Sequence, residues 1–311
     1  MKKNAGGSFT YAMHKFLPFR DLAACERVRA ITKEDITKHP NKQFRIRVIE
    51  DPMQFYTEFA LDIVTRIKNA LDEGRQFVGI FPVGPMPQYP IAARLINQLR
   101  IPLKHVHTFN MDEYADYDGT TAPAEWEGSF QRAMFDSFFN LIDPKLRPPL
   151  KQIHFPTKRY LKDYAKMIED AGGADVCYGG IGWCGHIAFW EAHLGDEFGD
   201  DLEAYKNAGP RHLELHPMTI MQNALHSFSG DWSWVPPCAN TIGPEQVMKA
   251  RWRSFWCDGY LGGGVSWQRF ICRLVAHGPV NTYVPGSILQ TVPGDYVILG
   301  GVADNCEIHM A

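Results

Sequence analysis

Along most of the chain, segments with the alternating hydrophobic and polar pattern of a strand are followed by segments with the apolar spacing of a helix. Residues 44–49 read FRIRVI, a strict alternation that predicts a strand. Pro52, followed by apolar residues at helical spacing, predicts the start of a helix. The same reasoning gives, in order, a strand over 77–81, a loop over 82–87, a helix over 88–99, a strand over 105–109, helices over 129–141 and 160–171, and a strand over 174–181. Strands that alternate with helices predict a mainly parallel sheet with helices on both faces.

The remainder of the chain is less regular. Residues 191–235 are rich in Gly, His and Asp and are expected to form a lid or loop region with short helices. A segment over 247–257, a helix over 267–275 and a strand over 296–299 are expected to complete the α/β sheet. No break in composition marks a linker, so we expect one α/β domain over 44–311, preceded by an N-terminal extension over 1–43.

Composition excludes several classes of protein. The 311 residues are 45% hydrophobic and 22% charged, as in ordinary globular proteins. A formal net charge of -3 gives no reason to expect binding to nucleic acid or to a membrane surface. No apolar run is long enough for a membrane span. The 7 cysteines form no CxxC pair and fit reduced thiols in the cytoplasm.

A histidine and a carboxylate follow the strand predicted over 174–181. This strand ends in glycines, and His186 and Glu191 come shortly afterwards. Ligands bind at the carboxyl ends of strands in open α/β sheets, and histidine titrates near neutral pH. The alternative is a structural turn with a hydrogen-bonded histidine. His186 is therefore a candidate acid or base only if a second cluster joins it.

A second cluster follows the strand predicted over 105–109. Asp112 and Glu113 are adjacent acids, which rarely lie unpaired in a core. One of them could instead cap a helix. Taken with His186 and Glu191, they form a plausible acid–base site.

Three motifs resemble those of the glucosamine-6-phosphate deaminase/isomerase family. Residues 108–114 read TFNMDEY and resemble that family's TFNMDEY. Residues 180–191 read GIGWCGHIAFWE and resemble its GxGxDGHIAFNE. Residues 278–280 and 285–290 resemble its GPV and PASxLQ. The match is good over 44–191 and patchier over 239–300.

This resemblance implies a fold and a chemistry. The fold is a modified Rossmann-like α/β domain, related to that of 6-phosphogluconolactonases. Asp112 matches the base that moves a proton between C2 and C1 of the opened amino sugar, His186 matches the residue that assists ring opening, and Glu191 matches the carboxylate that supports it. The family needs no metal or redox cofactor, so none is expected here. A sugar is the expected partner, and a homo-oligomer is an open expectation.

The chain departs from the family beside the expected acid. Cys184 replaces the Asp of the DGH triplet, and a free thiol is mostly uncharged at neutral pH. Trp183 and Trp190 replace small polar residues and are expected to reshape the pocket. Glu113 and Gly182 complete the substrate-binding residues expected from these two motifs.

A larger departure concerns the phosphate site. The family's glycine-rich loop matches residues 84–87, GPMP, where Gly84 and Met86 remain to line the pocket and two prolines lack an N–H. The phosphate-binding Arg and Lys match Ile220 and Gln268. Losing two charge-assisted hydrogen bonds of about 1.5–3 kcal/mol each weakens phosphate binding by about 10²–10⁴.

The sequence therefore predicts a sugar isomerase or deaminase whose substrate lacks the 6-phosphate. One alternative is a true glucosamine-6-phosphate deaminase with an anion site rebuilt from Arg251, Arg253 or Arg269. A second is a non-catalytic, sugar-binding relative. A zinc site from His107, Cys184 and His186 is a weaker alternative, and a lactonase is disfavoured by the 108–114 motif.

Overall fold

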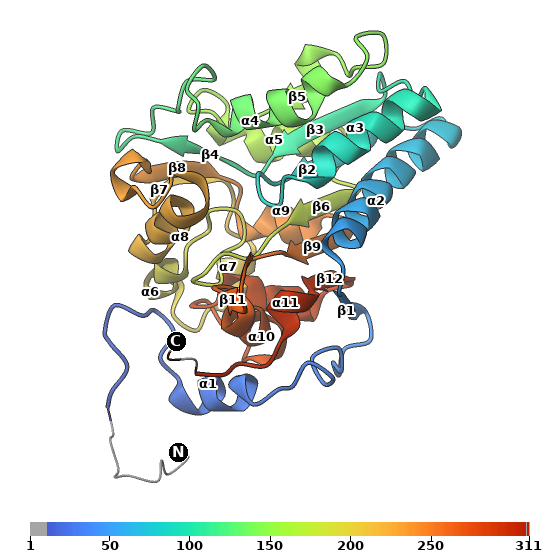
Figure 1. Ribbon diagram of the computed structural model, residues 1–311. Helices are drawn as coiled ribbons and strands as arrows, with labels where there is room; N and C mark the ends of the chain where they lie inside the picture. The colour runs from blue at the N-terminus through green and yellow to red at the C-terminus, as the bar shows by residue number, and fades with distance from the viewer. Residues whose placement is uncertain (1–10, 309, 311) are drawn as a thin grey trace.

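The computed structural model describes residues 11–308 and 310, which are built around a seven-stranded sheet (Figure 1). Every pair of neighbouring strands in this sheet is parallel. The spatial order is β1 (Phe44–Ile49), β12 (Gly294–Leu299), β9 (Trp252–Cys257), β6 (Val176–Gly179), β2 (Phe77–Phe81), β3 (Val106–Asn110) and β5 (Ile153–His154). The predicted class, a mainly parallel α/β sheet surrounded by helices, is confirmed.

Helix α2 (Pro52–Asp72) begins and packs as its sequence requires. Asp51 caps it, accepting a hydrogen bond from the Gln54 N–H at 2.7 Å, and Pro52 occupies the first turn, where no N–H is needed. Phe55, Phe59 and other apolar residues at helical spacing are buried against the sheet. Helix α3 (Gln88–Leu99) packs alongside α2 (Figure 1). The two helices thus bury apolar faces that the sequence pattern marks out.

The other helices are mostly shorter. They are α1 (Leu22–Arg29), α4 (Phe130–Ser137), α5 (Tyr164–Asp170), α6 (Gly195–Phe198), α7 (Leu202–Lys206), α8 (Pro217–Ser227), α9 (Pro244–Lys249), α10 (Arg269–His277) and α11 (Gly300–Ala303). Of the helices in the described part of the chain, none is long and apolar enough to cross a membrane.

A second sheet differs from the sequence prediction. Strands β4 (Asp112–Ala115), β8 (Cys238–Thr241) and β7 (Arg211–Glu214) form an antiparallel sheet in the order β4-β8-β7. The lid or loop region predicted over 191–235 does carry short helices such as α8, but it also contains strand β7, which was not predicted. These short strands have no distinctive local pattern, and β4 pairs with a strand far along the chain, so local periodicity does not reveal them.

The described part of the N-terminal extension packs on the α/β domain. Val28 of α1 and Ile36 are fully buried, and α1 contacts α10. The backbone oxygen of Ile36 lies 2.8 Å from Nε2 of His277, the last residue of α10. Residues 1–10 of the expected extension lie outside the described residues.

The strand order also positions the connecting loops. The carboxyl ends of β9, β6, β2 and β3 lie next to one another, so the segments that follow these four strands meet at one edge of the sheet. A short hairpin of β10 (Tyr260–Gly262) and β11 (Val265–Ser266) follows β9 at this edge.

Candidate active site

A cavity of about 830 Å³ lies at this edge of the sheet. Asp112 after β3, Gly84 and Met86 after β2, and Gly182 and His186 after β6 all line it. Thus the two clusters that the sequence singled out share one cavity, although they are more than 70 residues apart in the chain.

Asp112 is the acid that faces the cavity from β4. Its side chain is only 6% exposed. Burial raises the pKa of Asp112 from 3.8 to about 7, while the nearby His186 lowers the pKa and Glu113 raises it. A carboxylate with a pKa near neutrality suits a general base, because it both ionises and accepts a proton readily at pH 7.

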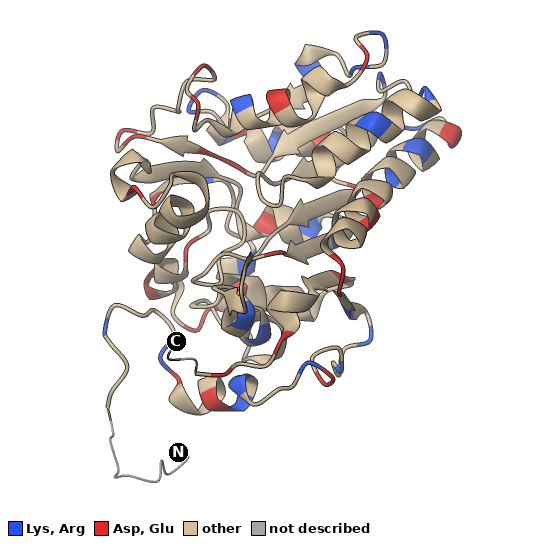
Figure 2. Cartoon of the chain, in the orientation of Figure 1, with Lys and Arg blue, Asp and Glu red and all other residues tan. Residues whose placement is uncertain are grey.

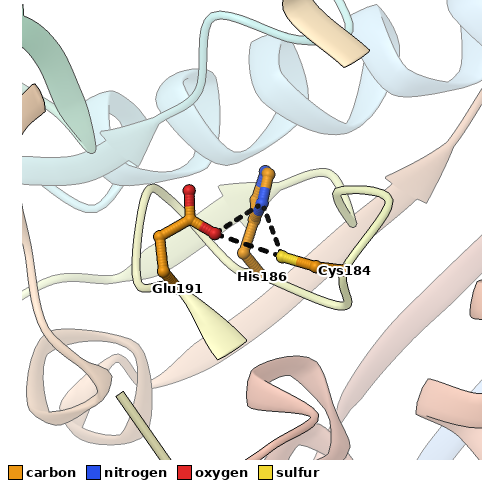
Figure 3. A group of neighbouring side chains, drawn as sticks. All are labelled: Cys184, His186 and Glu191. Atoms are coloured by element: carbon orange, nitrogen blue, oxygen red, sulfur yellow. Dashed lines mark hydrogen bonds and ion pairs between the residues drawn. The ribbon is translucent and has the colours of Figure 1, made fainter. Parts of the chain in front are cut away.

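His186 is held from behind by three side chains. The Thr219 hydroxyl lies 3.0 Å from the Nδ1 atom and donates to Glu191 Oε2 at 2.9 Å. Cys184 Sγ lies 3.4 Å from Nδ1 and donates to the same Glu191 oxygen at 3.1 Å (Figure 3). With Nδ1 occupied on this side, Nε2 is the ring nitrogen left for a ligand in the cavity.

These partners set the charge on the imidazole. Burial alone lowers the pKa of His186, but Cys184 and Glu191 beside it raise the pKa to about 10. Burial acts to raise the pKa of Glu191, but His186, Cys184 and Thr219 lower it below its ordinary value. The pair is therefore an imidazolium and a carboxylate at neutral pH, an arrangement that can donate a proton into the cavity.

Gly182 makes room for this histidine. A Cβ at position 182 would overlap Nε2 and the neighbouring atoms of the His186 ring. The Gly182 N–H also donates to the His186 carbonyl at 3.0 Å. The glycine in the motif is therefore required by the histidine that follows it.

Glu113 does not reach the cavity, contrary to the expectation that it binds substrate. It is fully buried and accepts hydrogen bonds from the backbone N–H groups of Tyr114, Phe130 and Gln131 and from the Ser129 hydroxyl. These contacts fix the start of helix α4 to β4. The capping role considered for one of the two acids thus belongs to Glu113, and Asp112 is free to face the cavity.

Neither tryptophan of the motif is among the described residues that line the cavity. Trp190 is fully buried, with its ring 6.1 Å from that of Tyr205 and under the guanidinium of Arg211. Trp183 is partly buried, and its ring centroid lies 6.3 Å from that of Trp267, which does line the cavity. Direct stacking of Trp190 on a sugar is ruled out by its burial.

The positions matched to the family's phosphate ligands carry no cation. Ile220 packs against the core from helix α8, which has no charged residue (Figure 2). Gln268 lines the cavity, but its amide is used internally, donating to the Ile181 carbonyl at 2.5 Å and accepting from the Gly259 N–H at 2.8 Å. Met86 offers only apolar surface.

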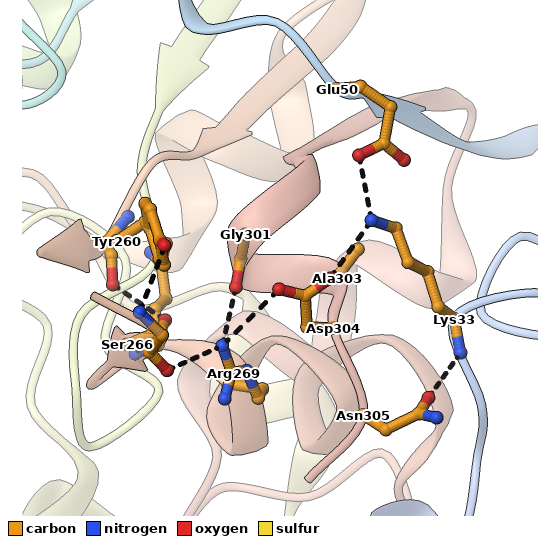
Figure 4. Close-up of polar contacts among 12 residues, drawn as sticks. Lys33, Glu50, Tyr260, Ser266, Arg269, Gly301, Ala303, Asp304 and Asn305 are labelled. Atoms are coloured by element: carbon orange, nitrogen blue, oxygen red, sulfur yellow. Dashed lines mark hydrogen bonds and ion pairs between the residues drawn. The ribbon is translucent and has the colours of Figure 1, made fainter. Parts of the chain in front are cut away.

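The arginines proposed to rebuild an anion site point elsewhere. Arg269 donates to the carbonyls of Gly264 and Gly301 and lies 3.7 Å from Asp304 (Figure 4). Arg251 pairs with Asp175 at 2.6 Å. Arg253 donates to backbone carbonyls, including that of Pro293 at 3.0 Å. None of the described residues that line the cavity is a lysine or an arginine.

The zinc alternative does not form as the sequence suggested. His107 lies on β3 with its ring 6.1 Å from that of His154, apart from the Cys184 group. Glu191 takes its place, so that ligand atoms of Cys184, His186 and Glu191 lie within 4.8 Å of one another. Hydrogen bonds through Thr219 already link these atoms, and they account for the cluster without an ion.

Sequence reasoning missed several residues of the site. Thr219 bridges His186 and Glu191. The only feature of the sequence that pointed to it is its place directly before Ile220, the position matched to the family's phosphate-binding Arg. Tyr56 of α2 and Asp258 after β9 also line the cavity, and the Tyr56 hydroxyl donates to Asp258 at 2.9 Å. Asp258 follows a predicted strand, which is the signal that could have found it.

Comparison with known structures defines the class of fold. A monomeric glucosamine-6-phosphate deaminase superposes with a TM-score of 0.69 and 19% identity, covering 83% of this chain and 98% of the other. The 6-phosphogluconolactonase of Trypanosoma cruzi superposes with a TM-score of 0.61 and 13% identity, covering 87% of this chain and 100% of the other. The chain therefore has the α/β fold that these sugar-phosphate enzymes share.

Comparison with curated sequences narrows the class to a family. A glucosamine-6-phosphate deaminase of Caenorhabditis elegans is 34% identical over 213 residues, which are 66% of this chain and 72% of the relative. One from Phocaeicola vulgatus is 30% identical over 249 residues, which are 74% of this chain and 87% of the relative. The chain matches no family model. It belongs to the glucosamine-6-phosphate deaminase/isomerase family, a family of enzymes, as its motifs predicted.

Proposed function

We propose that this protein is an aldose–ketose isomerase and deaminase that acts on an amino sugar without a 6-phosphate. The observation that carries the proposal is a cavity that pairs a buried base, Asp112, with a buried imidazolium, His186, and is lined by no lysine or arginine among the described residues. Family membership supports the chemistry, and the lining of the cavity supports a substrate without a phosphate.

The first step opens the ring. The His186 imidazolium donates a proton from Nε2 to the ring oxygen as the bond between C1 and that oxygen breaks. The C1 hydroxyl then gives its proton to the Nε2 atom that the first transfer left unprotonated, which leaves an aldehyde and restores the imidazolium. Glu191 and Thr219 orient the imidazole and favour its charged form before this transfer. The carbonyl then acidifies the C–H at C2.

The second step moves a proton. The Asp112 carboxylate removes the proton from C2 while the C1 carbonyl oxygen accepts a proton from the His186 imidazolium, which gives an enolamine. The protonated Asp112 then returns its proton to C1 as the amine nitrogen gives a proton back to the imidazole. The product carries an imine at C2, which water hydrolyses to a ketose and ammonia. Glucosamine and water would thus give fructose and ammonia, with every atom accounted for.

The direct test measures ammonia and ketose formation from glucosamine and from glucosamine 6-phosphate. We expect turnover of glucosamine, loss of turnover in Asp112→Asn, and a lower kcat/KM for the phosphorylated sugar, because its phosphate would meet no lysine or arginine among the described residues that line the cavity. Equal or faster turnover of the phosphorylated sugar would contradict an unphosphorylated substrate and favour a true glucosamine-6-phosphate deaminase. Saturable binding of glucosamine with no solvent deuterium entering C1 or C2 would instead identify a non-catalytic relative.

A further inference from the structure

Asp258 lines the cavity and is partly buried, but it has no part in the proposed chemistry. Asp258 directly follows β9, and its Oδ2 atom accepts a hydrogen bond from the Tyr56 hydroxyl at 2.9 Å. Among the described residues, no lysine or arginine forms an ion pair with it. An acid that faces a cavity without a cation has hydrogen-bonding capacity to offer to a ligand.

The strand order places Asp258 at the opposite end of the cavity from the base. The strands run β9, β6, β2 and β3, so the carboxyl ends of β9 and β3 are three strand spacings apart, or about 14 Å. Asp112 follows β3, His186 follows β6, and Asp258 follows β9. The base, the acid and this third group therefore lie in that order across the edge of the sheet.

This order matches the order of atoms in a pyranose. Proton transfer occurs at C2 and C1, ring opening at the ring oxygen, and the next atoms are C5 and C6. A sugar with C1 and C2 at Asp112 and its ring oxygen at His186 therefore extends its C6 end towards β9. Gln268, which matches the family's phosphate-binding Lys, bonds to Gly259 beside Asp258, so this end is also where the resemblance puts the phosphate.

The surroundings of Asp258 favour a carboxylate that accepts hydrogen bonds. Burial raises the pKa of Asp258 to about 6, while the Tyr56 hydrogen bond lowers it, so the group is mostly ionised at pH 7 to 8. Burial and Asp258 together raise the pKa of Tyr56, which keeps the phenol protonated as a donor to the carboxylate. Tyr260 and Trp267 flank this end with aromatic surface.

We propose that Asp258, oriented by Tyr56, is the specificity-determining residue that accepts a hydrogen bond from the C6 hydroxyl of the sugar and repels a phosphate at that position. The proposal rests on the proposed function, because it uses the placement of C1 and C2 at Asp112. Asp258 would favour an unphosphorylated substrate for a reason beyond the lack of a cation. This partly buried carboxylate can accept a hydrogen bond from a hydroxyl but would repel a negatively charged phosphate.

The experiment compares glucosamine with 6-deoxyglucosamine, which lacks only that hydroxyl. In the wild type, kcat/KM should fall by about 10- to 100-fold on removal of the hydroxyl, mainly through KM, as expected for one charge-assisted hydrogen bond. In Asp258→Asn, the kcat/KM values for the two sugars should agree within about 3-fold. The ratio of kcat/KM for glucosamine to that for glucosamine 6-phosphate should also fall. A wild type that treats the two sugars alike, or an Asp258→Asn variant that keeps the full preference, would overturn the proposal.

Controls separate a specific effect from a loss of charge or of folding. Asp72→Asn removes the same charge from the exposed end of α2, the helix that carries Tyr56, and should keep the wild-type preference. Tyr56→Phe removes the orienting donor and should reduce the preference partly, which keeps the proposal testable if Asp258→Asn fails to fold.

The two proposals fail in different ways. If no amino sugar is turned over, the proposed function is wrong, and calorimetric binding of glucosamine against 6-deoxyglucosamine still tests Asp258. If glucosamine is turned over and the C6 hydroxyl has no effect, the proposed function stands and the role of Asp258 is wrong.

Discussion

At the scale of single residues, Thr219 shows how the site tolerates a cysteine where the family has an aspartate. A neutral thiol holds an imidazolium less well than a carboxylate does. Here Glu191 provides the negative charge, and the Thr219 hydroxyl links that carboxylate to His186 Nδ1. Cys184 adds a second donor to the same oxygen. The substitution therefore leaves the histidine with a charged partner.

Removing this hydroxyl should disturb the histidine without removing it. Thr219→Val leaves a buried carboxylate oxygen and Nδ1 each short of a partner, so the free energy of unfolding should fall by about 1–3 kcal/mol in urea titrations. The kcat for glucosamine should fall by less than the roughly 100-fold or more expected for loss of His186 itself. Thr219→Ser should restore both values. Unchanged kcat in Thr219→Val would show that the hydroxyl does not position the ring.

The ionisation of Asp112 should set the acid side of the pH profile. A base must be deprotonated, and the pKa of Asp112 is raised by burial to about 7, so kcat/KM should fall about tenfold per pH unit below that value. Because the folded pKa lies above the ordinary value of 3.8, this group also favours folding most at low pH, and that contribution is lost as the pH rises towards about 7. A profile flat down to pH 5 would contradict the assignment of Asp112 as the base.

At the scale of elements, Arg269 fastens the β10–β11 hairpin to helix α11. Its guanidinium donates to Gly264 in the hairpin and to Gly301 in the helix (Figure 4). The hairpin in turn places Tyr260 and Leu261 on the cavity. Arg269 is therefore structural, although its neighbour Gln268 lines the site.

Arg269→Ala tests this role against the alternative of a rebuilt phosphate site. Loss of two charge-assisted hydrogen bonds should lower the free energy of unfolding by about 3–6 kcal/mol and raise KM for glucosamine and glucosamine 6-phosphate in parallel. Arg269→Lys should recover part of the stability. A selective loss of affinity for the phosphorylated sugar alone would show that Arg269 binds phosphate after all.

Individual elements also show how far sequence reasoning reached. Strand β1 and helices α2 and α3 were predicted because strict alternation, a Pro after a cap and helical apolar spacing are local signals. Strands β7 and β8 were missed because their stability comes from pairing with β4, not from their own pattern. The same local reading mistook Glu113 for a substrate ligand, because its four hydrogen-bond partners include residues 129–131.

At the scale of the whole molecule, an aromatic core between α2 and the sheet supports the site. The rings of Phe59 and Trp256 stack at 4.4 Å, and Trp256 is 1% exposed. Trp256 lies two residues before Asp258 on β9, so this packing fixes the strand end that carries the specificity residue.

Truncating this ring should cost much of the stability of the protein. Trp256→Ala should lower the free energy of unfolding by about 3–5 kcal/mol, because it leaves a cavity in a close-packed core. Trp232→Ala, at a ring that is 64% exposed, should stay within about 0.5 kcal/mol of the wild type. Denaturant titrations of both variants check the difference. Equal stabilities would place Trp256 outside the cooperative core.

The sequence by itself determined the class of fold, the family, and the segments after β3 and β6 that meet in the cavity. These follow from periodicity, glycines and motif spacing, which depend on residues close together in the chain. Only the tertiary structure decided which side chains face the substrate. In the structure, Glu113, Trp190 and Ile220 lie away from the cavity. Thr219 contacts His186, and Tyr56 and Asp258 line the end of the cavity beyond β9. Those outcomes depend on contacts between residues up to 202 positions apart, which no local pattern records.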